Sequence, residues 1–504
     1  MLRGSVLGLA LLCFVMSLNA AMEIVSIEII SAPPGGGSAN GSSLNASITP
    51  DGRYIVYNSS AQNLISGRTI YGTQIYFYDR ITGETRLVSQ NSSGQPGNRV
   101  SEAYDARNSI SADGRYVVFG SYATNLHPDK TLGNVQIFLW DRDTGSIDLI
   151  SRGMNGHQVN NDCFDPAISG DGRYISYNAL ATNIVPNDTN GRNDAILYDR
   201  ETKSTMRANM VDGLQCTDMT ALKDHALSFD GRYLVMRTGH TRIDSPSGAR
   251  AICVYDRITG EHTAIDISSS GERSDNPDSM TVINVEPAMA DNGRYVAFSS
   301  LSTNLVPNDN NSSRDIFVRD IEAGTTTRVS VASDGTESNG DSVRPFISSD
   351  GRFVCYVSTS TNLSPNDSDM GKDIYMHDCQ TGETILVSQN MDGIAGTSNS
   401  RKPAVSADGR WVVFDSYSGN LVPEDTNYHD DIFLVQLSMD DPTKWASYPI
   451  DQDTMDVDTG DFLGLINVKY GDFVWSYTTE SWLYCSEDYV GETGGWVYFP
   501  KVTD

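Results

Sequence analysis

The chain has 504 residues, of which 20% are charged and 39% hydrophobic, so its composition is that of an ordinary folded protein. Its formal net charge of −29 argues against nucleic acid as a partner, because phosphate binding needs clustered Lys and Arg. The same charge fits a protein that repels anionic surfaces and attracts cations.

The first 21 residues are predicted to be a signal peptide. Arg3 gives it a positive start, residues 6–18 form an apolar core, and Ala20 and Ala21 are small residues suited to a cleavage point. The apolar core is too short to span a membrane, and no later segment is apolar enough. We therefore expect a chain that is exported to the periplasm, the cell envelope or the outside of the cell, without a transmembrane segment.

Six cysteines follow the signal peptide, and an even number in an exported chain permits disulfides without requiring them. Cys163 and Cys216 fall in equivalent loops of neighbouring repeats and are the one pair considered for a bridge. Cys253 and Cys355 lie in apolar strands and are expected to be buried free thiols. No Cys-x-x-Cys motif or Cys/His cluster occurs, so a zinc site is not expected.

One motif, Asp-Gly-Arg followed by an aromatic residue, occurs seven times at intervals of 58 to 62 residues, with Asn in place of Asp in one copy. Gly accepts a positive φ without a Cβ clash, so the motif predicts a tight turn between two strands. Seven copies at nearly one spacing indicate a repeat architecture. The copies begin at Asp51, Asp113, Asp171, Asp230, Asn292, Asp350 and Asp408.

Each repeat divides into four short segments rich in Val, Ile, Phe and Tyr, which are predicted to be strands. In the fifth repeat they are 286–290, 295–300, 315–320 and 326–331. A Thr-Gly turn joins the third segment to the fourth. No stretch after the signal peptide shows helical periodicity. One such sheet cannot bury both faces alone, so the repeats are predicted to stack as the blades of an all-β, seven-bladed β-propeller.

The two ends of the array predict how the ring closes. The seventh repeat has three strands, the last at 431–436, and lacks a fourth, while a strand-like segment lies at 23–26. We therefore predict that the N-terminal strand completes the last blade, which removes an exposed sheet edge. Residues 22–437 then form the propeller, and residues 438–504, with four of the six tryptophans, form a small aromatic-rich all-β module.

The repeated phrase Pro-x-Ile-Ser-x-Asp-Gly-Arg-Tyr-Val-x-Phe-x-Ser, followed by Asp-Ile-Phe-Val-x-Asp, resembles the TolB-like WD40-type repeat of bacterial propellers. The resemblance covers nearly all of residues 23–437. The resemblance implies the propeller fold more than it implies a role. TolB itself is implied by its family to be a six-bladed periplasmic scaffold with an extra N-terminal domain. This chain departs from both features.

The loops between the second and third strands of four blades carry Asp or Asn at positions 1, 3 and 7. Oxygen ligands at this spacing can cradle Ca²⁺, although the bidentate Glu of the best-known calcium loop is missing. The competing interpretation is that these residues form Asx turns and that the last Asp ties the loop to its strand. The candidate calcium ligands are Asp188, Asn190, Asp194, Asp309, Asn311, Asp315, Asp367, Asp369, Asp373, Asp425, Asn427 and Asp431.

The two faces of the predicted ring differ. One face, here called the turn face, holds the Asp-Gly-Arg and Thr-Gly turns, and the repeated Arg there is expected to tie neighbouring blades through a carboxylate. The other, the long-loop face, holds the second-to-third loops and the loops that cross between blades. These loops are longer and vary more, so binding is expected on that face.

Three functions stay open. The favoured one is a non-catalytic, monomeric exported propeller that binds a protein or a cell-surface polysaccharide, with calcium as its one candidate cofactor. The alternative is a carbohydrate-active hydrolase or lyase with a site at the channel mouth, and the third is a purely structural component of the cell envelope. The seven histidines share no repeat position and no Gly-x-Ser-x-Gly motif occurs, so no catalytic residue is assigned.

Overall fold

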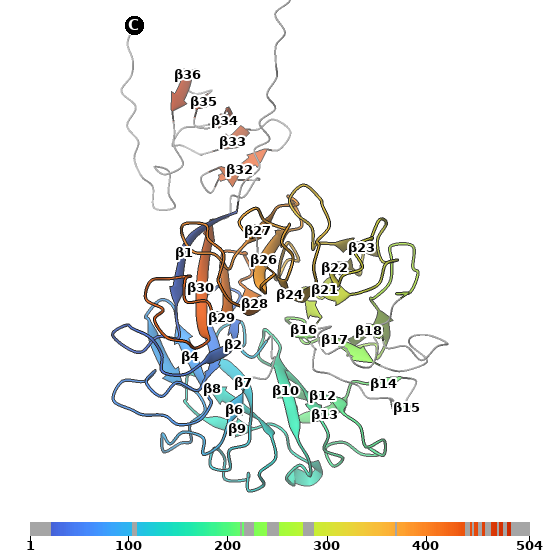
Figure 1. Ribbon diagram of the computed structural model, residues 1–504. Coiled ribbons are helices and arrows are strands. Elements are labelled where there is room, and N and C mark those ends of the chain that lie inside the picture. The colour runs from blue at the N-terminus through green and yellow to red at the C-terminus, as the bar shows by residue number, and fades with distance from the viewer. Residues whose placement is uncertain are drawn as a thin grey trace, which may run out of the picture. The chain divides into compact units, whose positions relative to one another are not determined.

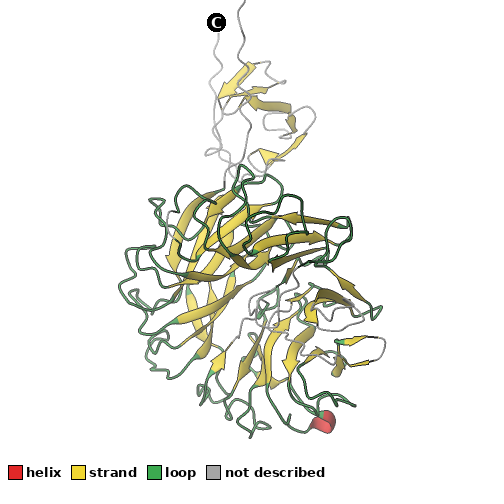
Figure 2. Ribbon diagram, turned by 45° about the vertical axis from the view of Figure 1, so that its right-hand side comes forward, coloured by secondary structure: helices red, strands yellow, loops and turns green. Residues whose placement is uncertain are grey.

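The computed structural model describes residues 22–102, 108–211, 214–215, 226–238, 251–275, 287–367 and 370–438, together with six short strands between residues 444 and 484. One compact unit is Ile24–Ser438, and the residues from 439 onward belong to another. Figure 2 shows that the described part is built almost wholly of strands and loops, with one 3₁₀ turn at Met154–Gly156. None of its helices is long and apolar enough to cross a membrane.

The unit Ile24–Ser438 contains seven antiparallel four-stranded sheets, which confirms the predicted seven-bladed propeller. In blades 1 to 6 the strands pair in chain order. Blades 1 to 3 are formed by β2 (Ser43–Ile48), β3 (Tyr54–Ser59), β4 (Gln74–Asp79) and β5 (Glu84–Leu87); β6 (Ser101–Glu102), β7 (Tyr116–Ser121), β8 (Gln136–Asp141) and β9 (Ile147–Leu149); and β10 (Cys163–Ile168), β11 (Tyr174–Ala179), β12 (Asp194–Asp199) and β13 (Ser204–Arg207).

The remaining blades follow the same plan, and blade 7 takes its outer strand from the N-terminus. Blades 4 to 7 are formed by β16 (Ala226–Leu227), β17 (Tyr233–Thr238), β18 (Ala251–Asp256) and β19 (His262–Ala264); β20 (Ala288–Met289), β21 (Tyr295–Ser300), β22 (Asp315–Asp320) and β23 (Thr325–Arg328); β24 (Ser342–Ile347), β25 (Phe353–Ser358), β26 (Asp373–Asp378) and β27 (Thr384–Leu386); and β28 (Ser400–Val405), β29 (Trp411–Ser416), β30 (Asp431–Ser438) and β1 (Glu23–Ile29).

Two further sheets lie outside the blades. A two-stranded sheet pairs β14 (Met210–Val211) with β15 (Leu214–Gln215). The C-terminal segment forms a six-stranded antiparallel sheet in chain order, as expected of an all-β module. Its strands are β31 (Lys444–Trp445), β32 (Tyr448–Asp451), β33 (Asp456–Asp458), β34 (Leu465–Tyr470), β35 (Phe473–Ser476) and β36 (Ser481–Tyr484).

The ring closes as predicted, because β1 pairs with β30 (Figure 1). Just beyond β1, the backbone N–H of Ile30 donates to the carbonyl of Ile432 at 3.0 Å. The Ser31 hydroxyl donates to Asp431, 400 residues later in the chain, at 2.7 Å. A segment from the start of the chain is thus joined to its last blade, and the outer edge of β30 is covered.

The hydrophobic core lies between adjacent blades. The second and third strands of a blade carry the largest buried rings, and in several blades two such rings stack, as Phe119 does on Phe138 at a centroid distance of 5.6 Å. Each buried cluster combines residues of neighbouring blades; one joins Tyr57 and Tyr76 of blade 1 to Val413 of blade 7. Burial therefore links each blade to the next, which explains why a single repeat is not a stable unit.

The Asp-Gly-Arg turn makes a specific joint between blades. In blade 2 the hydroxyl of Ser111 donates to Asp113 at 2.6 Å, and Asp113 accepts the backbone N–H of Arg115 at 2.9 Å. Gly114 has φ +67°, and a Cβ there would overlap Cδ2 of Tyr54 in blade 1. The turn therefore requires Gly because the aromatic ring of the preceding blade packs directly on it.

The repeated Arg differs from the expectation that it ties neighbouring blades. In six blades it pairs with the Asp that ends the third strand of its own blade, since both lie at the same end of one hairpin. In blades 1 to 4 the links between blades come instead from the Arg after that Asp, as Arg142 of blade 2 lies over the Tyr54 ring of blade 1 at 4.6 Å. The pairs within blades are Arg53–Asp79, Arg115–Asp141, Arg173–Asp199, Arg232–Asp256, Arg294–Asp320 and Arg352–Asp378.

The cysteine predictions are partly tested. Cys253 and Cys355 are buried thiols that form no disulfide, as expected. Cys163 is also a buried free thiol, so the bridge considered for it is not formed; Cys216 lies outside the described residues. Burial accounts for this, because Cys163 is fully enclosed in the core between blades 2 and 3.

Candidate functional site

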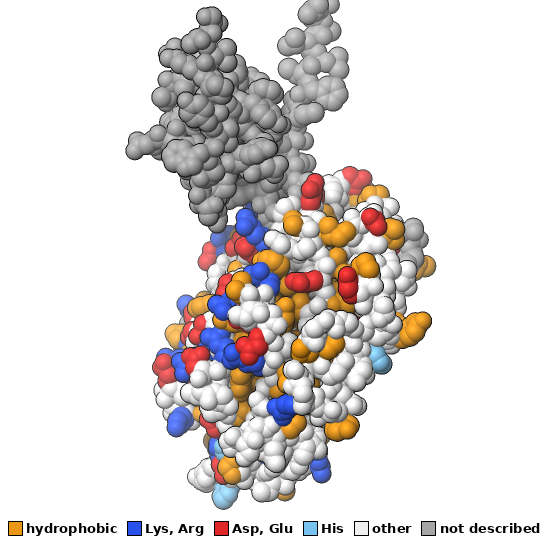
Figure 3. Space-filling model, turned by 90° about the vertical axis from the view of Figure 1, so that its left-hand side faces the viewer, with side chains coloured by type: hydrophobic (Ala, Val, Ile, Leu, Met, Phe, Trp, Pro, Cys, Tyr) orange, Lys and Arg blue, Asp and Glu red, His pale blue; other side chains and the backbone are white. Residues whose placement is uncertain are grey.

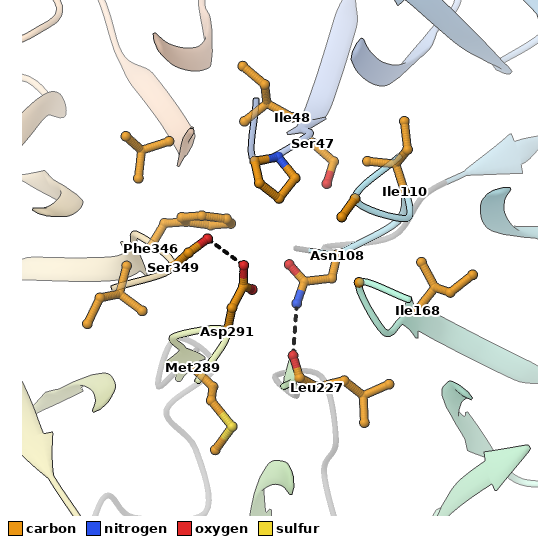
Figure 4. A pocket seen from close by; sticks show the side chains of 15 residues that line it. Ser47, Ile48, Asn108, Ile110, Ile168, Leu227, Met289, Asp291, Phe346 and Ser349 are labelled. Carbon is orange, nitrogen blue, oxygen red and sulfur yellow. Dashed lines mark hydrogen bonds between the residues drawn. The ribbon is translucent and has the colours of Figure 1, made fainter. Parts of the chain in front are cut away.

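The innermost strands line a central channel whose two ends differ. At the turn face the channel narrows to a cavity of about 50 Å³ (Figure 4). Backbone hydrogen bonds join neighbouring turns there, such as that from the N–H of Ala112 to the carbonyl of Gly170 at 2.9 Å. Most of the lining residues are apolar, but Asp291 accepts a hydrogen bond from Ser349, and burial raises the pKa of Asp291. The channel is therefore narrow at the turn face, where hydrogen bonds connect the turns of neighbouring blades.

At the long-loop face the channel opens into a larger cavity of about 280 Å³, lined by blades 1, 6 and 7. Four of its nine lining residues are basic, although the chain carries only 36 Lys and Arg against 65 Asp and Glu. We call this cavity the basic pocket. Its lining is Leu44, Asn45, Val343, Arg344, Val357, Lys372, Arg401, Lys402 and Asp415.

A β-bulge in the innermost strand places the key residues of the basic pocket. The register of β2, β24 and β28 against the second strand shifts just after their first two residues. The bulged residues Asn45, Arg344 and Lys402 have φ of +60°, +57° and +51°. Asn adopts this left-handed region readily, but Arg and Lys do so at a cost of about 1–3 kcal/mol each. A bulge redirects a side chain, and here it serves the channel lining.

The same bulge occurs in blade 3, where Asp165 has φ +50°. A proline follows the bulged residue in blades 3, 6 and 7. Proline is tolerated because a bulge on an edge strand needs no N–H donor. The corresponding stretches of blades 2, 4 and 5 fall at or beside 103–107, 216–225 and 276–286, outside the described residues.

Hydrogen bonds fix the floor of the basic pocket. Asp415 is 1% exposed; it accepts the backbone N–H of Asn45 at 3.2 Å and Nε of Arg401 at 3.2 Å. Lys402 Nζ donates to Oδ1 of Asn45, and Arg401 also pairs with Asp430. Burial raises the pKa of Asp415 to about 6, against the opposing effect of Lys402 and Arg401. The pocket thus combines four cations with one enclosed carboxylate.

This arrangement is suited to binding an anion. Basic side chains that converge on a partly enclosed cavity bind carboxylate, sulfate or phosphate groups more strongly than they would in water. The positive charge is local: on the face drawn in Figure 3, Lys and Arg lie interspersed with Asp and Glu along one side. The basic pocket differs from that mixed pattern, because four of its nine lining residues are basic and one is acidic.

The predicted calcium residues lie in the second-to-third loops of the same face, where the seventh-position Asp is buried and bonded to the fourth strand or its extension. In blade 5, Asp315 accepts the hydroxyl of Ser330 at 2.5 Å and the amide of Asn311 at 2.9 Å. In blade 3, Asp194 likewise accepts hydrogen bonds from the side-chain amides of Asn209 at 3.0 Å and Asn190 at 3.4 Å. The expected tie from loop to strand is therefore present.

In two of these loops a guanidinium lies between the first and seventh carboxylates. Arg207 approaches Asp194 at 3.1 Å and Asp188 at 3.8 Å in blade 3. In blade 5, Arg328 approaches Asp309 at 3.3 Å, Asp315 at 3.4 Å and Glu337 at 2.8 Å. These four position-1 and position-7 carboxylates thus already have a cation.

The remaining predicted ligands lie in blades 6 and 7. Asp367 accepts the hydroxyl of Tyr375, and Asp373 accepts Ser388 at 2.7 Å. Asp369 lies outside the described residues. Within the described ranges no three His, Cys, Asp or Glu side chains gather as a metal site. Calcium in these loops stays a prediction.

The basic pocket was not predicted from the sequence. Its residues lie in three blades, and their approach depends on ring closure and on a bulge that the hydrophobic pattern does not show. One signal was present: Arg344-Pro345 and Lys402-Pro403 occupy the same position of two repeats, inside a predicted strand where proline is unfavourable.

Neither a protein-family model nor a curated protein matches the chain. Among solved structures, it is similar to TolB from Acinetobacter baumannii, with 14% identity over 73% of this chain and 76% of that one and a TM-score of 0.37. An oligogalacturonate lyase in complex with manganese has 11% identity, coverage of 83% and 98%, and a TM-score of 0.47. Oligogalacturonate lyase from Vibrio parahaemolyticus has 12% identity, the same coverage and a TM-score of 0.45.

The chain is a seven-bladed β-propeller. That conclusion rests on the seven four-stranded blades themselves and on the repeat that builds them. Likeness at these identities concerns the fold alone, and role must be argued from the site.

Proposed function

We propose that this chain is an exported, non-catalytic binding protein whose long-loop face holds an anionic group of a protein or an extracellular polymer in the basic pocket. The observation that carries the proposal is the convergence of Arg344, Lys372, Arg401 and Lys402 on one cavity in a chain of net charge −29. Most of the chain repels anions, so a partner would be bound at this one mouth and kept off other surfaces.

The bulge geometry supports the proposal. Unfavourable backbone at Arg344 and Lys402 is most readily understood where the side chain is needed in a particular direction. The apolar wall of Leu44, Val343 and Val357 would contact the uncharged part of a ligand.

The test is a binding measurement with chemically defined probes: polygalacturonate, poly-glutamate and the neutral polymer dextran, each at low and high salt. We expect the anionic probes to bind and dextran not to bind, with affinity falling as salt rises. The double variant Arg344→Ala/Lys402→Ala should weaken binding by about 100-fold or more, since each bond to a charged group contributes about 1.5–3 kcal/mol.

Arg410→Ala is the matched control, because Arg410 belongs to an Asp-Gly-Arg turn at the opposite face. Equal losses in the control and the double variant would show non-specific attraction and contradict the proposal. Shortening of polygalacturonate during incubation would contradict its non-catalytic part and favour the hydrolase or lyase alternative.

A further inference from the structure

The second-to-third loops of different blades can be aligned residue by residue. The reference point is the hydrogen bond between the seventh loop residue and the fourth strand or the residues just after it. Ser330 makes that bond in blade 5, and Ser31 makes it in blade 7. Both hydroxyls also accept the N–H of the residue after that Asp, at 3.0 and 2.9 Å. The residue two places before this bonding partner is therefore equivalent in every blade. It is Arg207 in blade 3, Arg328 in blade 5, Leu386 in blade 6 and Ile29 in blade 7.

Three of these loops contain a cation of the chain itself. Arg207 and Arg328 fill the loops of blades 3 and 5, as described above. In blade 2, Lys130 stands where the other loops have their first Asp and is 1% exposed. Its Nζ donates to the carbonyl oxygens of Leu132 at 3.0 Å and Asn134 at 2.5 Å. The loop is thus a cradle of oxygens that holds a positive charge.

Blade 6 has Leu386 in place of the Arg, and a neutral donor compensates, because the Tyr375 hydroxyl bonds to Asp367. Blade 7 lacks both groups: Ile29 stands in place of the Arg, and Phe433 has no hydroxyl in place of that of Tyr375.

Asp425, the first residue of the blade 7 loop, is 7% exposed, and its Oδ1 is enclosed with no hydrogen-bond partner among the described residues. Asp431 is fully buried. No ion pair reaches either carboxylate within the described part of the chain. The partners of Asp431 are neutral: the Ser31 hydroxyl at 2.7 Å and the Asn427 side-chain amide at 2.8 Å. Buried carboxylates without an opposite charge are costly, so this loop is short of one cation.

We propose that the blade 7 loop binds one Ca²⁺ through the carboxylates of Asp425 and Asp431, in the place that Arg207 and Arg328 occupy in blades 3 and 5. Calcium accepts carboxylate, carbonyl and water oxygens in flexible numbers, which suits a loop with two carboxylates, whereas Mg²⁺ requires a stricter octahedron. The inference does not depend on the proposed binding of an anion in the basic pocket, and it reduces four candidate calcium loops to one.

The test is calorimetric titration of the EDTA-treated full chain with Ca²⁺, followed by Tb³⁺ luminescence. We expect one site per chain with a Kd on the order of 10⁻⁴–10⁻³ M, as in extracellular modules, and a higher Tm in Ca²⁺. Asp425→Asn should abolish the heat and the Tm shift. Ile29→Arg should abolish both while keeping the Ca²⁺-free Tm at or above that of the wild type, because it supplies the missing guanidinium.

Asp309→Asn is the matched control, since it alters the same loop position in blade 5 and should leave Ca²⁺ binding unchanged. The proposal is overturned if the wild type shows neither heat nor Tm shift, or if the Ca²⁺ response survives in Ile29→Arg. Because the basic-pocket variant Arg344→Ala/Lys402→Ala does not touch this loop, it should retain full Ca²⁺ binding even if it binds no polymer.

Discussion

The two ends of the channel are formed by the same repeat but differ in how uniform they are. At the turn face every blade repeats one joint, a glycine at positive φ with the aromatic ring of the preceding blade packed on it. At the long-loop face the equivalent positions differ from blade to blade, and there the bulged Asn45, Arg344 and Lys402 gather basic side chains. Positions that repeat thus maintain the ring, and positions that differ are available for function.

The largest expected effect is at the turn face. Gly114→Ala forces a non-glycine residue into φ +67° and drives its Cβ against the Tyr54 ring, so we expect it to lower the free energy of unfolding by about 3 kcal/mol or more. Gly145→Ala, in the same blade at φ +68° with no atom within 4 Å, should cost only about 1 kcal/mol. Urea unfolding of the two variants measures the difference.

Neither glycine variant should change the affinity for anionic probes while the chain stays folded. Equal destabilisation by the two substitutions would show that the turn conformation alone requires glycine. The joint between blades would then not explain why the motif is repeated.

The sequence was sufficient for the turn face and for closure. Asp-Gly-Arg, or Asn-Gly-Arg in blade 5, marks every turn between the first and second strands, and the strand missing after residue 437 is found at β1. Both features are local or can be counted along the chain. The partner of the repeated Arg was predicted wrongly, since a motif shows that a charge exists and not which carboxylate lies beside it.

The basic pocket could not be predicted in this way. Net charge indicated a chain that disfavours anions, but four basic side chains converge locally on one cavity at the channel mouth. Asn45 and Lys402 lie 357 residues apart in the chain and meet only because the ring closes. Their left-handed φ is a property of the folded strand.

An intermediate effect is expected from Asp415, at the long-loop face. Burial raises its folded-state pKa to about 6, above the usual unfolded value, so the folded state binds the proton more tightly than the unfolded state does. The resulting stabilisation is complete at pH below the unfolded pKa and is lost as pH rises through 6. Relative to Asp415→Asn, the wild type should lose roughly 2–3 kcal/mol of stability between pH 4 and pH 7.

Urea unfolding of both proteins across that pH range measures this difference. A difference that does not change with pH would mean that Asp415 stays ionised throughout, held so by Arg401 and Lys402. The basic pocket would then be more fully neutralised than we infer.

The smallest expected effect separates the two faces most directly. Arg344→Asn places at the blade 6 bulge the residue type that blade 1 already uses at Asn45, and Asn tolerates a left-handed φ far better than Arg. We therefore expect the variant to be equal to the wild type or more stable by up to about 1 kcal/mol, and to bind anionic probes more weakly. A variant that lost both stability and binding would show that Arg344 supports the fold. A gain of stability with a loss of binding means that the strained backbone at the long-loop face is retained because the side chain it directs is needed there.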